Sequence, residues 1–250
     1  MKKTALLIIV AILTIARIHA QEVAIPKIGV KAPEFTAQST NGEINFPSDF
    51  GNHWKILFSH PKDFTPVCTS EILELAHEQE SFEKMGTKIA VVSVDPLEQH
   101  QSWKDAMEMM EYKDRYTEKI QFPLVADNDK AIASLYGMIH TTADVNRNVR
   151  GVYFIDPENI IRAIFFYPNE VGRSVDEMKR TLLALQANYE NNNLLAPADW
   201  VPGEDMIVKV LSQEDEKTIN NKGSKYYQYS WFLVFMRNSG RKWAPGIRAR

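Results

Sequence analysis

One cysteine, Cys68, lies in a sequence context that suits a nucleophilic thiol. Thr65 precedes it by three residues and Pro66 by two, which is typical of a helix start with threonine as the N-cap and proline at the first helical position. The free backbone N–H groups and the dipole of a helix N-terminus stabilise a thiolate, the reactive form of cysteine. The Thr65 hydroxyl can donate a hydrogen bond to the sulfur or to a molecule beside it, and Pro61 can shield the pocket from water. The pattern predicts a thiolate nucleophile at Cys68.

The cysteine count narrows this chemistry. A chain with one cysteine in 250 residues cannot form an internal disulfide or a cysteine-rich zinc site, so activity as a dithiol oxidoreductase is excluded. The alternative to a reactive thiol is that Cys68 is an inert apolar side chain in the core.

Composition and charge limit the class of protein. With 44% hydrophobic and 24% charged residues, the chain is expected to form a packed globular core. The formal net charge is −3, or −6 without Lys2, Lys3 and Arg17. No general polyanion-binding surface is indicated, and nucleic acid is not expected as a partner.

The elements around Cys68 alternate between strands and helices. A proline- and glycine-rich stretch at residues 25–48 predicts a small hairpin, and Trp54–Ser59 reads as a buried strand that leads through a turn into the Cys68 helix. A second buried strand is expected at Lys88–Val94, followed by a helix over Leu97–Tyr112.

The same alternation continues toward the C-terminus. The pattern predicts a strand at Phe122–Val125, a helix at Lys130–Tyr136, a hairpin of Gly151–Ile155 with Ile160–Phe166, and a long helix from Ser174. This order indicates an α/β fold with a central mixed sheet covered on both faces.

The segment Pro61–Glu71, Pro-Lys-Asp-Phe-Thr-Pro-Val-Cys-Thr-Ser-Glu, resembles the peroxidatic-cysteine signature of the peroxiredoxins. His60, Arg150 and the stretch Val171–Arg173 extend the match over nearly all of residues 25–200. The residues Pro197–Trp200 and Lys225–Tyr229 resemble the C-terminal extension of the one-cysteine subgroup. The resemblance implies a thioredoxin-like fold with a small C-terminal dimerisation extension.

The resemblance also implies roles for individual residues. Cys68 corresponds to the peroxidatic cysteine, Thr65 and Arg150 to its hydrogen-bonding partners, and Pro61 to the proline that shields the pocket. Thiolate attack on a peroxide develops negative charge on the leaving oxygen, which a guanidinium and a hydroxyl can stabilise. The residues expected to support this site are His60, Glu71 and Arg173.

No metal or other cofactor is expected. The histidines His53, His77, His100 and His140 show no metal-ligand spacing and are interpreted as ordinary polar residues. The acids Asp95, Asp127 and Asp129 are interpreted as turn and capping residues.

The expected activity is thiol-specific reduction of hydrogen peroxide and alkyl hydroperoxides through a cysteine sulfenic acid. Without a second cysteine, an external thiol must reduce that acid, either a thioredoxin-like protein or a small thiol. The competing hypothesis is a non-enzymatic, exported chaperone or binding protein with a thioredoxin fold.

Some one-cysteine members of the peroxiredoxins carry a lipase-type serine before the active-site strand. The matching residues here, Gly51–Lys55, contain no serine, so phospholipase activity is not expected of this protein.

Residues 1–20 have the features of a secretory signal peptide, with two lysines, an apolar run and a small residue, Ala20, at the expected cleavage site. The expected location is therefore outside the cytoplasm, in a bacterial periplasm. An uncleaved membrane anchor is the alternative, although the apolar run is short for a membrane span.

The remaining chain divides into a core domain at residues 21–195, an extension at 196–236 and a basic tail at 237–250, which is expected to be disordered. Five aromatic or aliphatic side chains of the extension would share one face of a single extended strand: Tyr227, Tyr229, Trp231, Leu233 and Phe235. This apolar face predicts a homodimer or higher homo-oligomer. Stable membrane insertion is not expected, because the segment is short and lacks a helical apolar stripe.

Overall fold

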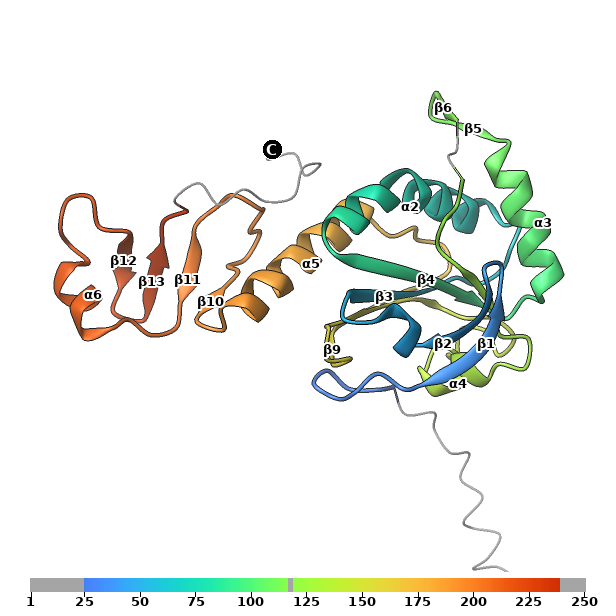
Figure 1. The fold of residues 1–250 in the computed structure, drawn as a ribbon, viewed down its shortest axis with the longest axis horizontal. Helices are drawn as coiled ribbons and strands as arrows, with labels where there is room; N and C mark the ends of the chain where they lie inside the picture. The colour runs from blue at the N-terminus through green and yellow to red at the C-terminus, as the bar shows by residue number, and fades with distance from the viewer. Residues whose placement is uncertain (1–24, 117–118, 239–250) are drawn as a thin grey trace, which may run out of the picture.

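The computed structural model describes residues 25–116 and 119–238. Its core is a seven-stranded sheet in the order β2-β1-β7-β4-β3-β8-β9, with helices on both faces (Figure 1). The first two strands of this order are β2 (Gly42–Phe46) and β1 (Phe35–Ser39). The central strands β3 (Trp54–Ser59), β4 (Thr87–Ser93) and β7 (Leu124–Ala126) are parallel. The strands β8 (Arg150–Ile155) and β9 (Ile161–Tyr167) are antiparallel to their neighbours. The predicted α/β fold with a mixed sheet is confirmed.

Two apolar clusters fill the space between the sheet and its helices. Alternation along β3 places Ile56 and Phe58 in one cluster and Leu57 in the other. The first cluster packs against α2 (Pro66–Lys84), α3 (Leu97–Glu108) and α5 (Val175–Glu190), and the second packs against α4 (Ala131–Leu135). Because both faces of the central strands are buried, they read as continuous apolar runs in the sequence.

The local predictions around Cys68 agree with the structure. The helix α2 begins at Pro66, Thr65 occupies the N-cap position, and the preceding strand is β3. The N-terminal hairpin forms from β1 (Phe35–Ser39) and β2 (Gly42–Phe46), followed by a 3-10 turn, η1 (Ser48–Phe50). The predicted hairpin of β8 and β9 is present, and Ser174 caps α5 by accepting a hydrogen bond from the Glu177 N–H.

The helix predicted over Leu97–Tyr112 was too long. It ends at Glu108, and the chain then forms a two-stranded hairpin of β5 (Glu111–Tyr112) and β6 (Arg115–Tyr116). The residues Lys113 and Asp114 that connect these strands both have positive φ angles, 53° and 57°. Such a pair of left-handed residues makes the tight turn that matches the twist of a hairpin.

The C-terminal extension is a separate four-stranded sheet (Figure 1). Its strands are β10 (Leu194–Leu195), β11 (Met206–Val208), β12 (Tyr226–Ser230) and β13 (Leu233–Met236), with the short helix α6 (Gln213–Thr218) between β11 and β12. Since β10 pairs with β11, the extension begins at Leu194, whereas the sequence places its start at 196.

The aromatic segment of the extension differs from the prediction of one extended strand. It folds back at Trp231 and Phe232, so that β12 and β13 form an antiparallel hairpin. Tyr227, Tyr229 and Phe235 still share a face, with ring centroids 5.4 to 5.7 Å apart. Trp231 is instead 86% exposed at the turn.

Two predictions fall wholly or partly outside the described residues. The signal peptide at residues 1–20 lies entirely outside them, and so does the tail beyond residue 238. Arg237 is described, and its guanidinium carbon lies 4.5 Å from the centroid of the Tyr227 ring. No described helix is long and apolar enough to span a membrane.

Candidate active site

Cys68 lies in the first turn of α2, which follows β3 after the loop of residues 60–65. Its side chain is fully buried, and the Thr69 N–H donates to the Thr65 carbonyl at 2.9 Å, which starts the hydrogen bonds of the helix. The Thr65 hydroxyl differs from expectation, because it donates to the Lys62 carbonyl at 2.8 Å rather than to the sulfur. This bond closes the turn between residues 62 and 65. Pro61 is buried in the same turn.

Arg150 reaches Cys68 from the start of β8. Its Nη1 lies 3.4 Å from the Cys68 sulfur and 2.6 Å from a Glu71 carboxylate oxygen. Its Nε and Nη2 donate to the Asn169 carbonyl at 3.0 and 2.6 Å. All five donors of a guanidinium lie in one plane, so these bonds fix the orientation of the group that faces the sulfur.

Glu71 joins two arginines behind the cysteine. It lies one helical turn after Cys68 and accepts hydrogen bonds from the Arg173 backbone N–H, Nε and Nη2 at 2.7 to 2.8 Å. The Arg173 guanidinium also donates to the Gly151 carbonyl at 2.8 Å and lies 3.3 Å from the centroid of the Phe58 ring. The predicted supporting residues Glu71 and Arg173 are therefore in contact with each other and, through Arg150, with the cysteine.

The site is electrostatically unusual because its charges are buried. Burial by itself raises the pKa of Glu71. The hydrogen bonds and the positive charge of Arg173, together with the charge of Arg150, outweigh this effect and hold the pKa of Glu71 below its ordinary value. Burial lowers the pKa of Arg173, against the raising effect of Glu71. One carboxylate thus faces two guanidinium groups, and Arg150 places a positively charged guanidinium 3.4 Å from the Cys68 sulfur.

The third supporting residue, His60, belongs to a cluster that the sequence did not predict. His60 and His100 both contact the carboxylate of Asp63, at 2.8 and 2.7 Å. All three side chains are buried. The interpretation of His100 as an ordinary polar residue was wrong, because the fold brings α3 against the loop that follows β3. No metal-ligand spacing signals this contact, since the residues are 37 positions apart.

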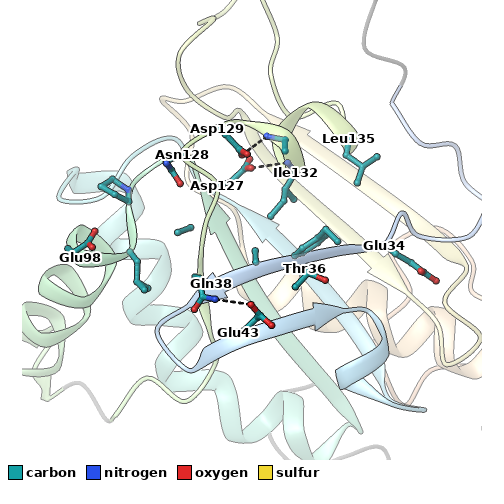
Figure 2. A pocket seen from close by; sticks show the side chains of 16 residues that line it. Glu34, Thr36, Gln38, Glu43, Glu98, Asp127, Asn128, Asp129, Ile132 and Leu135 are labelled. Atoms are coloured by element: carbon teal, nitrogen blue, oxygen red, sulfur yellow. Dashed lines mark hydrogen bonds between the residues drawn. The ribbon is translucent and has the colours of Figure 1, made fainter.

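Two of the three acids interpreted as turn and capping residues, Asp127 and Asp129, cap a helix, whereas Asp95 accepts from the Asp63 N–H and from the side chains of Ser93 and Gln99. Asp127 accepts from the backbone N–H groups of Ile132 and Ala133 at the start of α4, and Asp129 accepts from Ala131. Burial raises the pKa of Asp127 to about 6. Asp127 and Asp129 line a cavity of about 870 Å³ together with Glu34, Glu43 and Glu98 (Figure 2). Cys68 does not line this cavity, so it is separate from the site described above.

Comparisons with known proteins agree with this geometry. Residues 28–164 match the AhpC/TSA family. The chain is 45% identical to a peroxiredoxin of Methanosarcina mazei over 184 residues, which cover 73% of this chain and 84% of the relative. The chain belongs to the peroxiredoxin family. It is also 39% identical over 198 residues to a 1-Cys peroxiredoxin of Dictyostelium discoideum, covering 79% of this chain and 80% of that one.

Solved peroxiredoxin structures have the same fold over most of the chain. The yeast mitochondrial 1-Cys peroxiredoxin superposes with a TM-score of 0.74 at 33% identity, covering 85% of this chain and all of the other. Peroxiredoxin 6 of Arenicola marina superposes with a TM-score of 0.75 at 27% identity, covering 86% of this chain and 99% of the other. The fold is thioredoxin-like, as predicted.

Family membership decides the activity. The protein is a thiol-dependent peroxidase, an oxidoreductase, and its sequence contains one cysteine. Peroxiredoxins use peroxide substrates and thiol reductants and commonly oligomerise. Nothing in the comparisons favours the alternative of a non-enzymatic chaperone.

Proposed function

We propose that Cys68 attacks a peroxide oxygen while Arg150 holds the peroxide in line. The 3.4 Å contact between Arg150 Nη1 and the Cys68 sulfur carries this proposal. The thiolate sulfur bonds to one peroxide oxygen, the O–O bond breaks, and the leaving oxygen departs as water or an alcohol after gaining a proton. The Arg150 guanidinium stabilises the negative charge that develops on the leaving oxygen. Cys68 becomes a sulfenic acid.

Pro61 and Thr65 complete the pocket in this proposal. Pro61 has no N–H to hydrate and is buried beside the cysteine turn, where it excludes water. The Thr65 hydroxyl can rotate from the Lys62 carbonyl to donate to a bound peroxide, because a hydroxyl adjusts its direction at small cost.

An external thiol then reduces the sulfenic acid, and we propose a thioredoxin-like protein or a small thiol for this step. The structure described for the yeast mitochondrial relative concerns thiol resolution by the glutathione and thioredoxin systems, which supports this class of reductant. Stopped-flow measurement of hydrogen peroxide consumption with dithiothreitol tests the whole cycle. We expect one dithiol oxidised per peroxide consumed, and a burst of only one peroxide per chain without dithiol. Absence of such a burst would refute the proposed cycle.

We propose that the aromatic hairpin of the extension forms a homodimer contact. Tyr229, Trp231 and Phe232 are 75%, 86% and 70% exposed, and contiguous exposed apolar side chains of this size mark interaction sites. Aromatic residues also dominate the energetics of protein interfaces.

Substitution of Trp231 and Phe232 by serine is expected to convert the dimer to a monomer without unfolding the chain, because both side chains are largely exposed at a turn. Sedimentation velocity of the full-length variant measures the change, and Tyr116→Ser, an exposed aromatic of the core domain (77%), is the matched control. A variant dimer of unchanged size would place the interface elsewhere, for example at the edge strand β9.

We propose that the protein is exported to the periplasm after cleavage near Ala20. The basic, apolar and small residues of the first 20 positions support this proposal. The intact mass of protein recovered from the periplasmic fraction of a bacterial host should correspond to a chain beginning at Gln21. Recovery from the cytoplasm with residues 1–20 retained would contradict it.

A further inference from the structure

The cluster of His60, Asp63 and His100 has no part in the peroxide chemistry proposed above. His60 and Asp63 lie in the loop that carries Pro61 and Thr65, directly before Pro61 and two residues before Thr65, and His100 lies on α3. The three residues are 0%, 1% and 0% exposed. A buried carboxylate that contacts two imidazoles must be explained, because burying charge is costly unless the charge is paired.

Hydrogen-bond counting assigns the protons of this cluster. His100 Nε2 lies 3.1 Å from the Val125 carbonyl, which can only accept, so Nε2 carries a proton. Its Nδ1 lies 2.7 Å from Asp63 Oδ2. Burial opposes ionisation of Asp63, but the hydrogen bonds from His100 and His60 outweigh it, and the pKa of Asp63 lies below its ordinary value. An ionised carboxylate can only accept a hydrogen bond, so this contact requires a second proton on His100, at Nδ1.

His60 is the remaining member of the cluster, and its ring is neutral. Burial lowers the pKa of His60 more than its hydrogen bond with Asp63 raises it. Its single proton lies on Nε2, which is 2.8 Å from Asp63 Oδ1, and its Nδ1 has no partner among the described residues. The cluster then has a net charge of zero, with Asp63 negative and His100 positive. The N···O distances fit bonds that contain a proton. The ligand atoms of a tetrahedral metal site, each about 2.0 Å from the ion, would instead be about 3.3 Å apart. The shorter distances here therefore favour hydrogen bonds over a bound metal ion.

The cluster also connects the loop to three other elements. The Asp63 backbone N–H donates to Asp95 Oδ2 at 2.9 Å, just beyond β4, and His100 contributes contacts to α3 and to Val125 on β7. The next residue, Phe64, is 56% exposed and has a φ of 55°. This conformation is strained for a bulky residue and persists only where surrounding contacts hold it. Asp63, the residue directly before Phe64, is held by hydrogen bonds at its backbone N–H and at both carboxylate oxygens.

We propose that Asp63 and His100 are positioning residues for the peroxide reaction, and that their buried carboxylate–imidazolium pair fixes the loop that holds Pro61 and Thr65 over Cys68. The proposal rests on the proposed roles of Pro61 and Thr65. The protonation of His100 does not depend on those roles and is measured separately.

Two substitutions of Asp63 test the proposal. Asp63→Ala removes both contacts, and we expect the second-order rate with hydrogen peroxide to fall about 10- to 100-fold, as small displacements in an active site do. Asp63→Asn can keep every hydrogen bond. Its amide oxygen accepts from His60 Nε2, and its amide N–H donates to His100 Nδ1, which gives up its proton. We therefore expect Asp63→Asn to restore the rate to within a few-fold of the parent.

The spectroscopic signature distinguishes this assignment from a purely structural role. The ¹⁵N resonances of His100 should show two protonated nitrogens in the parent at neutral pH and one in Asp63→Asn. Asp127→Ala, which removes another buried carboxylate, controls for general destabilisation and should leave the peroxide rate of the folded protein unchanged.

A neutral His100 in the parent, or a folded Asp63→Ala variant that reacts at the parent rate, overturns the proposal. Metal analysis provides a further check. A stoichiometric metal in the purified parent that is lost in Asp63→Ala would also overturn it, because the cluster would then hold an ion in place of the protons.

Discussion

Replacement of Cys68 by serine is expected to abolish peroxide consumption. A serine hydroxyl stays protonated at neutral pH and is a weak nucleophile without an adjacent general base. The chain has no other cysteine to substitute for it. Removal of a catalytic nucleophile lowers rates by several orders of magnitude, so the variant should consume peroxide no faster than the dithiol in the buffer does by itself.

The comparison needs protein of equal stability. Sulfur and oxygen differ little in size, and Cys68 is one small side chain in a large apolar cluster, so the thermal unfolding midpoint should shift by only a few degrees. Stopped-flow assays of both proteins with excess dithiothreitol measure the difference. Equal slow rates for parent and Cys68→Ser would show that the cysteine does not carry the activity.

Replacement of Arg150 by lysine is expected to lower the second-order rate with hydrogen peroxide by about 10²- to 10³-fold, the usual effect of losing one donor to a developing oxyanion. Lysine keeps the charge but not the planar group. It cannot contact the sulfur, Glu71 and the Asn169 carbonyl together, as Arg150 does. The rate is therefore measured on variant protein that is shown to be folded by its thermal unfolding transition.

The neighbouring strand offers a matched control. Arg162 on β9 pairs with Asp156 through a partly exposed guanidinium, 28% exposed, and does not contact the site. Arg162→Lys should react at the parent rate. If Arg150→Lys also reacts at the parent rate, Arg150 does not face the reacting oxygens and its assigned role is wrong.

Much of the fold and of the nucleophile could be predicted from the sequence because these features depend on near neighbours. The apolar run of β3, the Thr65-Pro66 helix start and the position of Cys68 in the first turn follow from local backbone preferences. The end of α3 could not be placed in the same way. Lys113 and Asp114 adopt left-handed conformations without the Asn-Gly or Asp-Gly pair that signals such a turn in a sequence.

The reversal in the aromatic segment of the extension could not be predicted from the sequence either. Alternation correctly places Tyr227, Tyr229 and Phe235 on one face. It could not show that the chain reverses between them, because Trp231 and Phe232 are not turn-forming residues. The fold-back exposes these two rings at a tip.

The sequence alone is enough to predict a single thiol nucleophile at a helix N-terminus, preceded by a buried strand. The groups that surround this thiol come together only in the folded chain. Glu71 meets Arg150 and Arg173 across 79 and 102 residues, and Asp63 meets His100 across 37. These charged groups are stable in the core only when paired, and packing of the strands and helices against one another forms the pairs. No local pattern encodes them.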